Sequence, residues 1–428
     1  MVDKVTLIGL KNNNLGDIVI LDTCKYLVRQ LFPNAKISVQ NIFPETIKMK
    51  DINASYPKIN LIIEKFASYT YFVQILNFVK WWLSQKRGTS VYKYYKRILK
   101  RNSKVIFAGG GLIKFSREDL WNPIYSIITY CQRKRIPVYF NAVGVEGYDE
   151  KNFYSQLLKY SLNKSCVKKI TTRDDIDSLN KYVKDKDKIG IVGDPALWTK
   201  ETYNVEDVKK TDIIGVGVIR GKIFTDYGFD FSEEQIVNSY VNIIRKLEEK
   251  GYKWQMFCNG AKSDYKMGKN ILEKLGLPES EEYLAPRPRK AIDLVKQIYS
   301  YKATISARLH ANIIAVSYGI PTIGIVWNNK LKLFGKIIGC PERFIENEKF
   351  SDADFVVSSL ESAVAQGYDN SIIETLKLST LNSISENLEL NLLGNKTSHP
   401  ERISGGGYPL NACICCVLGI NILDKKEI

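Results

Sequence analysis

The first 200 residues alternate short apolar runs with longer stretches in which apolar residues recur at helical spacing. The apolar runs predict strands at 5–10, 35–39, 104–108, 137–140, 168–172 and 189–192. The amphipathic stretches predict helices, among them 18–31 and 120–133. Strands that alternate with helices of this length are typical of parallel βαβ units.

A polar stretch without strand signals, near 200–210, separates this region from a second one of the same kind. There the strands are expected at 213–219, 254–258, 303–306 and 321–326, and the helices at 232–250, 264–275, 291–299 and 309–318. The predicted fold is therefore α/β, with two doubly wound Rossmann-like domains facing each other across a cleft. We expect domains at 1–205 and 206–350, C-terminal helices that pack back at 351–395, and a tail at 396–428.

Composition narrows the class of protein without naming a function. The 428 residues are 45% hydrophobic and 25% charged, which is usual for globular proteins and excludes collagen, a coiled coil and wholesale disorder. No apolar run approaches the roughly 18–20 residues that span a bilayer, and the first residues lack the features of a signal peptide. A cytoplasmic protein is expected. The cluster of Cys413, Cys415 and Cys416 has no second half at zinc-like spacing, so no metal is expected.

The net charge of +16 favours anionic partners, although a lysine-biased composition would also produce it. The segment 69–104 adds apolar residues to this charge, because Phe72, Trp81 and Trp82 precede a dense run of Lys and Arg. That order is typical of a helix at an acidic membrane surface, on the inner face of the membrane in a cytoplasmic protein. A packed helix pair with a solvated basic face is the structural alternative. No nucleic-acid-binding motif accompanies the segment, so nucleic acid is not an expected partner.

Histidine is scarce, since only His310 and His399 are present. His310 lies where the strand at 303–306 passes into the next helix, close to Arg308. The free N–H groups and the dipole of a first helical turn attract anions, so this turn predicts an oxyanion site with a proton donor beside it. The structural alternative is a half-buried histidine at a domain interface and an arginine in an ion pair.

Other turns after strands supply weaker candidates for substrate binding. The glycine run lets backbone N–H groups approach a phosphate or sugar, but it is neither a dinucleotide fingerprint nor a P-loop. Arginines and lysines at strand ends could bind a dianion, with ion pairs as the alternative. Asp17 could bind a polyol or cap a helix. The candidates are Asn14, Asp17, Gly109, Gly110, Gly111, Lys114, Arg173, Arg220 and Lys330.

Taken in order, these turns resemble the polysaccharide pyruvyl transferase family over about residues 4–344. The matching pieces are Asn14-Leu-Gly-Asp17, Phe107-Ala-Gly-Gly-Gly111, Asn141-Ala-Val-Gly-Val145, Thr171-Thr-Arg-Asp174, Gly193-Asp-Pro195, Arg308-Leu-His310, Gly319-Ile-Pro321 and Lys330. The resemblance implies a GT-B-like fold and transfer of a pyruvyl group from phosphoenolpyruvate to a sugar, giving a cyclic ketal without metal or cofactor. The family's Arg-x-His motif, associated with donor binding and acid catalysis, maps onto Arg308 and His310.

The sequence leaves open which residue is the base and whether the protein has one of two other functions. The base that deprotonates the sugar could be Asp17, Glu118 or Glu146. A GT-B glycosyltransferase with a nucleotide-sugar donor would share the architecture and the anion site. A non-enzymatic protein that binds anionic surfaces would account for the charge and for segment 69–104. The acceptor is expected to be a glycan, either a cell-surface polysaccharide or its lipid-linked precursor.

Overall fold

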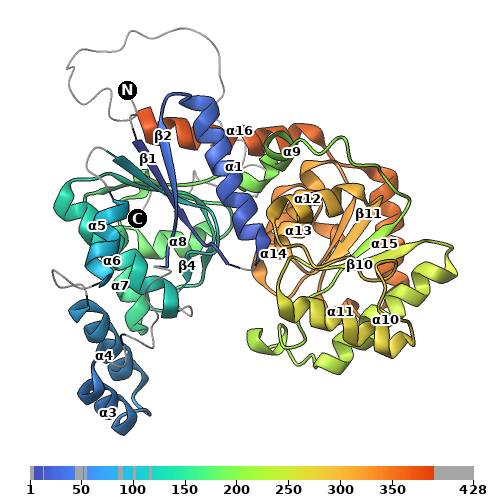
Figure 1. The fold of residues 1–428 in the computed structure, drawn as a ribbon, viewed down its shortest axis with the longest axis horizontal. Coiled ribbons are helices and arrows are strands. Elements are labelled where there is room, and N and C mark those ends of the chain that lie inside the picture. The colour runs from blue at the N-terminus through green and yellow to red at the C-terminus, as the bar shows by residue number, and fades with distance from the viewer. Residues whose placement is uncertain are drawn as a thin grey trace, which may run out of the picture. The chain divides into compact units, whose positions relative to one another are not determined.

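The computed structural model describes residues 4–12, 14–43, 52, 55–84, 90–99, 103–114 and 118–389. Within this range the chain forms two compact units (Figure 1). Unit 1 contains residues 4–11, 24–192 and 380–389, and unit 2 contains residues 12–23 and 193–379. The chain passes between them at 11/12 and 192/193, and also within two helices, α1 (Leu15–Leu31) and α16 (Asn370–Glu389).

Unit 1 is built on six parallel strands in the order β2-β1-β3-β5-β7-β8. Their bounds are β1 (Lys4–Gly9), β2 (Lys36–Asn41), β3 (Ser103–Ala108), β5 (Val138–Val143), β7 (Val167–Thr172) and β8 (Ile189–Ile191). The direction in which the chain builds the sheet reverses between β1 and β3. Ligands of doubly wound sheets bind at such a switch point, beyond the carboxyl ends of the strands.

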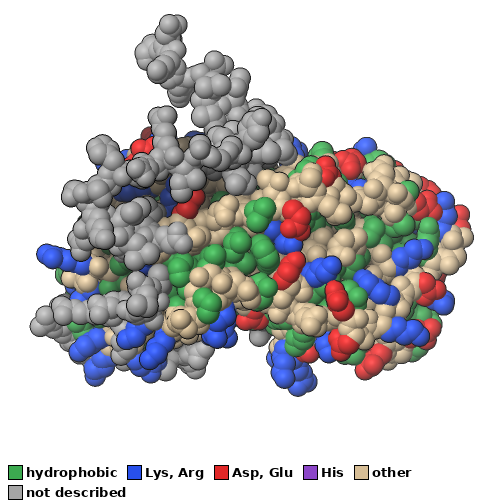
Figure 2. Space-filling view, turned by 90° about the horizontal axis from the view of Figure 1, so that it is seen from above, with side chains coloured by type: hydrophobic (Ala, Val, Ile, Leu, Met, Phe, Trp, Pro, Cys, Tyr) green, Lys and Arg blue, Asp and Glu red, His purple; other side chains and the backbone are tan. Residues whose placement is uncertain are grey.

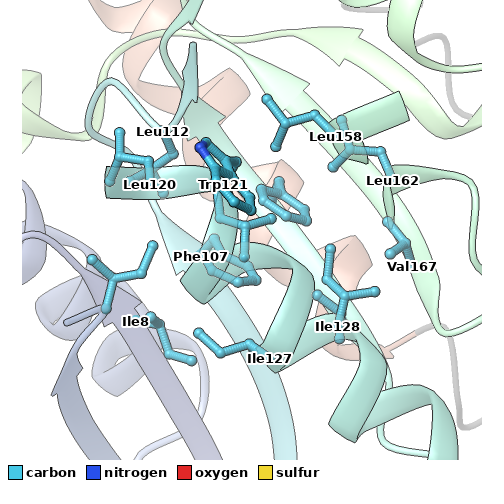
Figure 3. Close-up of a cluster of buried hydrophobic side chains, with 14 of the residues drawn as sticks. Ile8, Phe107, Leu112, Leu120, Trp121, Ile127, Ile128, Leu158, Leu162 and Val167 are labelled. Atoms are coloured by element: carbon cyan, nitrogen blue, oxygen red, sulfur yellow. The ribbon is translucent and has the colours of Figure 1, made fainter. Parts of the chain in front are cut away.

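Aromatic stacking forms much of the unit 1 core. The Trp121 ring of α6 (Glu118–Lys134) stacks on Tyr154 of α7 (Phe153–Leu162), with ring centroids 4.2 Å apart. Beneath them Phe107 stacks on Phe140 across two strands at 4.3 Å. Figure 3 shows how aliphatic side chains of the strands and both helices close around these rings. Burying each large apolar side chain contributes about 1.5–3 kcal/mol, so this layer holds the carboxyl ends of β3 and β5 in place.

Unit 2 contains a second parallel sheet, with the order β10-β9-β11-β12-β13. Its strands are β9 (Ile214–Gly217), β10 (Trp254–Phe257), β11 (Ala303–Ser306), β12 (Thr322–Ile325) and β13 (Phe344–Ile345). Its main helices are α10 (Glu233–Glu249), α11 (Lys262–Leu275), α12 (Ala291–Ser300), α13 (Leu309–Ser317), α14 (Asn329–Ile337) and α15 (Ala353–Gln366). The switch point falls between β9 and β11. The predicted α/β class with two doubly wound parallel sheets is thereby confirmed.

The segment 69–104 contains more structure than one interfacial helix. It holds α4 (Thr70–Leu83), α5 (Ser90–Ile98) and the start of β3, and α3 (Pro57–Lys65) precedes it. Figure 1 shows α3 and α4 extending from unit 1, away from its sheet. The expectation that Trp81 enters a membrane is wrong, because Trp81 is buried and its Nε1 donates to Ser126 Oγ at 2.6 Å. Trp82 and Phe72 are exposed. In the described residues, no helix combines the length and hydropathy of a membrane span.

Candidate active site

The switch point of unit 2 gathers charged and polar residues from three strand ends. Arg220 follows β9, Asn259 and Asp264 follow β10, and Arg308 and His310 follow β11. Because β10, β9 and β11 are neighbouring parallel strands, their carboxyl ends share one edge of the sheet. Residues about 90 positions apart in the sequence are thus brought together by strand order.

Asp264 is the centre of this group. Arg308 donates to it twice, from Nε to Oδ2 at 2.8 Å and from Nη2 to Oδ1 at 2.6 Å, and the backbone N–H of Arg220 donates to Oδ1 at 3.1 Å. The carboxylate is fully buried and the Arg308 side chain is largely so. Bidentate pairing fixes the plane of a guanidinium. The ion pair considered as an alternative for Arg308 is therefore present, and a bound anion would meet the Nη1 side of the guanidinium.

His310 is the second residue of α13, and Arg308 is the N-cap residue of that helix. The imidazole is nearly buried and packs against the first turn of α1, in the stretch that belongs to unit 2. A Cβ added to Gly16 would lie 2.5 Å from His310 Cβ and 2.6 Å from Nδ1, so only glycine allows this approach. The start of α1 is itself fixed, since Leu15 N–H donates to the Asn259 carbonyl at 3.0 Å.

Asn14 and Asp17 belong to the same unit as His310, although the sequence places both in the expected first domain, 1–205. Asp17 Oδ2 accepts from Asn12 Nδ2 at 3.0 Å and from Asn14 Nδ2 at 3.4 Å. The helix begins at Leu15, so Asp17 lies inside the first turn and the N-cap interpretation is wrong. A carboxylate in this position suits the helix dipole. The two side chains together form a polar surface at the start of α1.

Asn259 and Asp264 are the residues that sequence reasoning missed. Asn259 is buried, and in the described part of the chain neither its Oδ1 nor its Nδ2 has a hydrogen-bond partner. Buried amides are nearly always paired, so an orphaned one at a strand end points to a ligand. The signal available in the sequence was position alone, since Cys258-Asn-Gly260 directly follows a strand.

Arg220 and Lys330 lie at the margins of this group. Arg220 Nη2 pairs with Asp226 Oδ2 at 2.5 Å, and both side chains are a third or more exposed. Such a pair contributes little to stability and can open for a ligand. Lys330 is in the first turn of α14, after β12, and is half-buried.

The glycine run occupies the switch point of unit 1, after β3. Gly109 and Gly110 have φ of 53° and 72°, a left-handed conformation that favours glycine. The turn is held against β5, because Gly109 N–H donates to the Asn141 carbonyl at 2.8 Å and Gly144 N–H donates to the Gly110 carbonyl at 2.6 Å. The tight turn is therefore built into the sheet edge, with Gly109 and Gly110 buried and Gly111 half-buried.

Two further candidates lie at the same edge of unit 1. Lys114 of β4 (Ile113–Lys114) pairs at 2.5 Å with Glu146 of β6 (Val145–Glu146). Arg173 is nearly buried and follows β7. Asp174 fixes this turn, since its Oδ1 accepts from Val145 N at 2.7 Å and from Thr172 Oγ1 at 2.9 Å. Arg173 thus lies in unit 1, whereas Arg308 lies in unit 2.

The structure also bears on the candidate bases and on metal binding. Asp17 lies in unit 2, as His310 does. Glu146 is paired with Lys114, and the side chain of Glu118 lies outside the described residues. So do His399 and the Cys413, Cys415 and Cys416 cluster. Within the described residues no group of three or more His, Cys, Asp or Glu could hold a metal ion.

A cavity of about 430 Å³ lies elsewhere, at the amino edge of the unit 1 sheet, beside Lys4, Lys36 and Arg97. It is at the opposite end of the strands from the glycine turn. We do not assign the active site to it, because ligands of doubly wound sheets bind at the carboxyl ends.

Comparison with known proteins decides which family these sites belong to. The sequence matches the family described as polysaccharide pyruvyl transferase over residues 14–329. The chain belongs to the polysaccharide pyruvyl transferase family. This span contains the glycine turn of unit 1 and the Arg308 and His310 turn of unit 2. The enzyme is therefore a transferase whose family acts on polysaccharides. A comparison with curated proteins gives no match.

Solved structures resemble this chain in fold. UDP-GlcNAc 2-epimerase of Methanocaldococcus jannaschii, in complex with UDP-GlcNAc and UDP, has a TM-score of 0.52 and 12% identity, covering 92% of this chain and 99% of its own. A putative UDP-N-acetylglucosamine 2-epimerase from Listeria monocytogenes also has a TM-score of 0.52 and 12% identity, covering 94% and 99%. The similarity supports the GT-B-like fold class and, at such identity, shows the fold alone.

Proposed function

We propose that this enzyme transfers a pyruvyl group from phosphoenolpyruvate to a sugar of a cell-surface polysaccharide or its lipid-linked precursor. The products would be a pyruvate ketal and phosphate, and neither metal nor cofactor would take part. The observation that carries the proposal is the convergence of Arg220, Arg308 and His310 at the switch point of unit 2. This group of residues combines anion-binding groups with a source of a proton, and phosphoenolpyruvate requires both.

Phosphoenolpyruvate carries a carboxylate and a phosphate on the same enol carbon. Its binding site therefore requires positively charged groups held in a fixed orientation. Arg308 provides a guanidinium whose orientation is set by buried Asp264. The first turn of α13 adds free backbone N–H groups and the positive end of a helix dipole. Asn259 would donate a further hydrogen bond from its buried amide. Arg220 and Lys330 would complete the site. Arg220 would give up its ion pair with Asp226 and pair with the donor instead.

His310 would act as the general acid. It would transfer a proton to the methylene carbon, which leaves positive charge on the carbon that bears the carboxylate. A sugar hydroxyl would add there and lose its proton, and a second hydroxyl would then displace phosphate and close the ketal. Imidazole suits this role because its ordinary pKa is near neutral pH. Asp17 is the candidate base in the same unit.

The acceptor would use the corresponding edge of unit 1. The glycine turn would bind sugar hydroxyls through backbone N–H groups beyond Gly109, whose own N–H donates to the Asn141 carbonyl. Lys114 and Arg173 provide charged donors at the same sheet edge, and Arg173 could alternatively bind a donor oxygen. We place the reaction in the cytoplasm, because Cys131, Cys166, Cys258 and Cys340 are buried thiols outside any disulfide, which suits a reducing compartment.

The experiment is a transfer assay with purified enzyme, phosphoenolpyruvate and a panel of free and lipid-linked glycans. Release of phosphate together with the mass gain of a ketal on one glycan is the expected result. Arg308→Lys keeps the charge but loses the planar fork, so its donor KM should rise. UDP-sugars with the same panel test the nucleotide-sugar alternative. Release of UDP and glycosyl transfer, without reaction of phosphoenolpyruvate, would overturn the proposal.

A further inference from the structure

The helical hairpin of α3 and α4 carries large apolar side chains on its surface. Leu61 is 66% exposed, Phe66 37% and Phe72 40%, and Ile62 and Tyr69 are exposed beside them. The Phe66 ring lies 5.5 Å from the Phe72 ring and 6.2 Å from the Tyr69 ring, so these residues form one aromatic group. We call the five residues the hairpin patch. A contiguous apolar surface of this kind marks an interaction site.

The hairpin is held firmly on its other side. Trp81 is anchored on Ser126, and the Phe78 ring lies 5.0 Å from Tyr125 and 5.9 Å from Trp121. Lys80 Nζ ties α3 to α4 through Asn60 Oδ1 at 3.0 Å. No residue of α3 is buried. The patch residues of α3 are therefore not needed for the core, and folding does not explain their apolar character.

Basic residues predominate in the part of the sequence that contains the hairpin. Residues 52–117 contain thirteen Lys and Arg and a single carboxylate, Glu64, which gives +12 of the chain's +16. Exposed cations lie on α3 at Lys58 and Lys65, and on α5 at Lys93, Lys96 and Arg97. Unit 2 differs on the face that Figure 2 shows, where acidic and basic side chains are interspersed. The positive excess is thus concentrated in the part of the sequence that contains the hairpin, and two exposed cations, Lys58 and Lys65, lie on the hairpin itself.

We propose that the hairpin patch docks the enzyme on a lipid bilayer with acidic headgroups. A bilayer matches both properties, because its interface takes up apolar side chains and its headgroups attract Lys and Arg. A second copy of the chain would bring the same positive charge to the contact, which disfavours self-association through this surface. The binding is reversible and does not depend on the reaction proposed above.

The test is co-sedimentation with vesicles, which requires no activity. Wild type should bind phosphatidylglycerol-rich vesicles at least about tenfold more tightly than pure phosphatidylcholine vesicles, and high salt should weaken the binding. The variant Leu61→Ser, Phe66→Ser, Phe72→Ser should bind the acidic vesicles about 10³-fold more weakly, since each of the three lost apolar side chains accounts for about tenfold. Its thermal unfolding should match wild type.

The matched control replaces three equally exposed apolar residues outside the hairpin, Tyr160→Ser, Val364→Ser and Leu378→Ser. This control should bind vesicles as wild type does. Equal binding by the two triple variants, or no binding of wild type to acidic vesicles, overturns the proposal. Sedimentation velocity without lipid tests whether the hairpin patch instead joins two copies of the chain. A dimer that the hairpin variant abolishes, together with absent vesicle binding, would assign the patch to a second copy instead.

Discussion

His310 packs against the Cα of Gly16 so closely that a methyl group at Gly16 would lie 2.5 Å from the His310 Cβ. The contact joins the first turn of α1 to the first turn of α13. It fixes the imidazole from the side opposite to its own helix. The position of the proposed acid thus depends on a glycine almost 300 residues away in the sequence.

Gly16→Ala should therefore displace the imidazole and lower kcat by at least about tenfold, because a misplaced catalytic group loses much of its effect. Overpacking should also cost about 1–3 kcal/mol of unfolding free energy. Gly190→Ala is the matched control, since a Cβ there meets nothing nearer than Thr171 Cγ2 at 3.7 Å. Transfer kinetics and urea unfolding measure both effects. An unchanged kcat in Gly16→Ala would show that the contact does not position His310 for catalysis.

His310→Ala should reduce kcat by about 10²–10⁴, the range for removal of a positioned acid. Phosphoenolpyruvate affinity should change much less, because the charges that bind the donor remain in place. Titration calorimetry with phosphoenolpyruvate and the transfer assay separate the two quantities. If turnover stays near the wild-type value, another residue must donate the proton.

Asp264→Asn should raise the donor KM more than it lowers kcat. The variant keeps the shape of the side chain but removes the carboxylate that holds Arg308 by two hydrogen bonds. Loss of a buried partner costs up to about 3–5 kcal/mol, so unfolding free energy should fall as well. Asp226→Asn, which breaks the exposed pair with Arg220, should change stability by less than about 1 kcal/mol. A donor KM that is equal in Asp264→Asn and wild type would rule out positioning of Arg308 by this carboxylate.

Local signals made the fold and one turn of the site predictable. The strand at 303–306 coincides with β11, and Gly319 ends α13 with φ of 68°, so Arg308 and His310 were placed correctly beside a helix start. The partner of Arg308 was not predictable, because Asp264 is 44 residues earlier and only the order β10-β9-β11 brings the two together. Trp81 and Trp82 show a different limit. Neighbouring helical residues point in different directions, so Trp81 is buried on the side of Ser126 while Trp82 is exposed.

Cys258 directly precedes Asn259, and its thiol should titrate far above the ordinary range. Burial raises the pKa of Cys258 to about 11. The folded state then keeps a proton that the unfolded state loses above about pH 8.5. Unfolding free energy should therefore fall as pH rises from there towards 11, by about 1.4 kcal/mol per pH unit for this group. Urea unfolding between pH 8 and pH 10 should show a shallower decline in Cys258→Ala. Parallel curves for the two proteins would contradict the burial argument.

Asn259→Ala separates a ligand-binding amide from a structural one. A buried amide without a partner costs about 1–3 kcal/mol, so its removal should leave the unfolding free energy of the ligand-free enzyme unchanged or slightly higher. Phosphoenolpyruvate raises the melting temperature in proportion to its affinity. This rise should shrink in Asn259→Ala if the amide donates to the donor, with affinity about tenfold lower. Asn387→Ala provides the matched control, because Asn387 is equally buried and also lacks a hydrogen-bond partner within the described residues, but lies on α16 in unit 1. The control should respond to phosphoenolpyruvate as wild type does. An undiminished melting shift in Asn259→Ala would remove Asn259 from the donor site and leave its burial without a functional explanation.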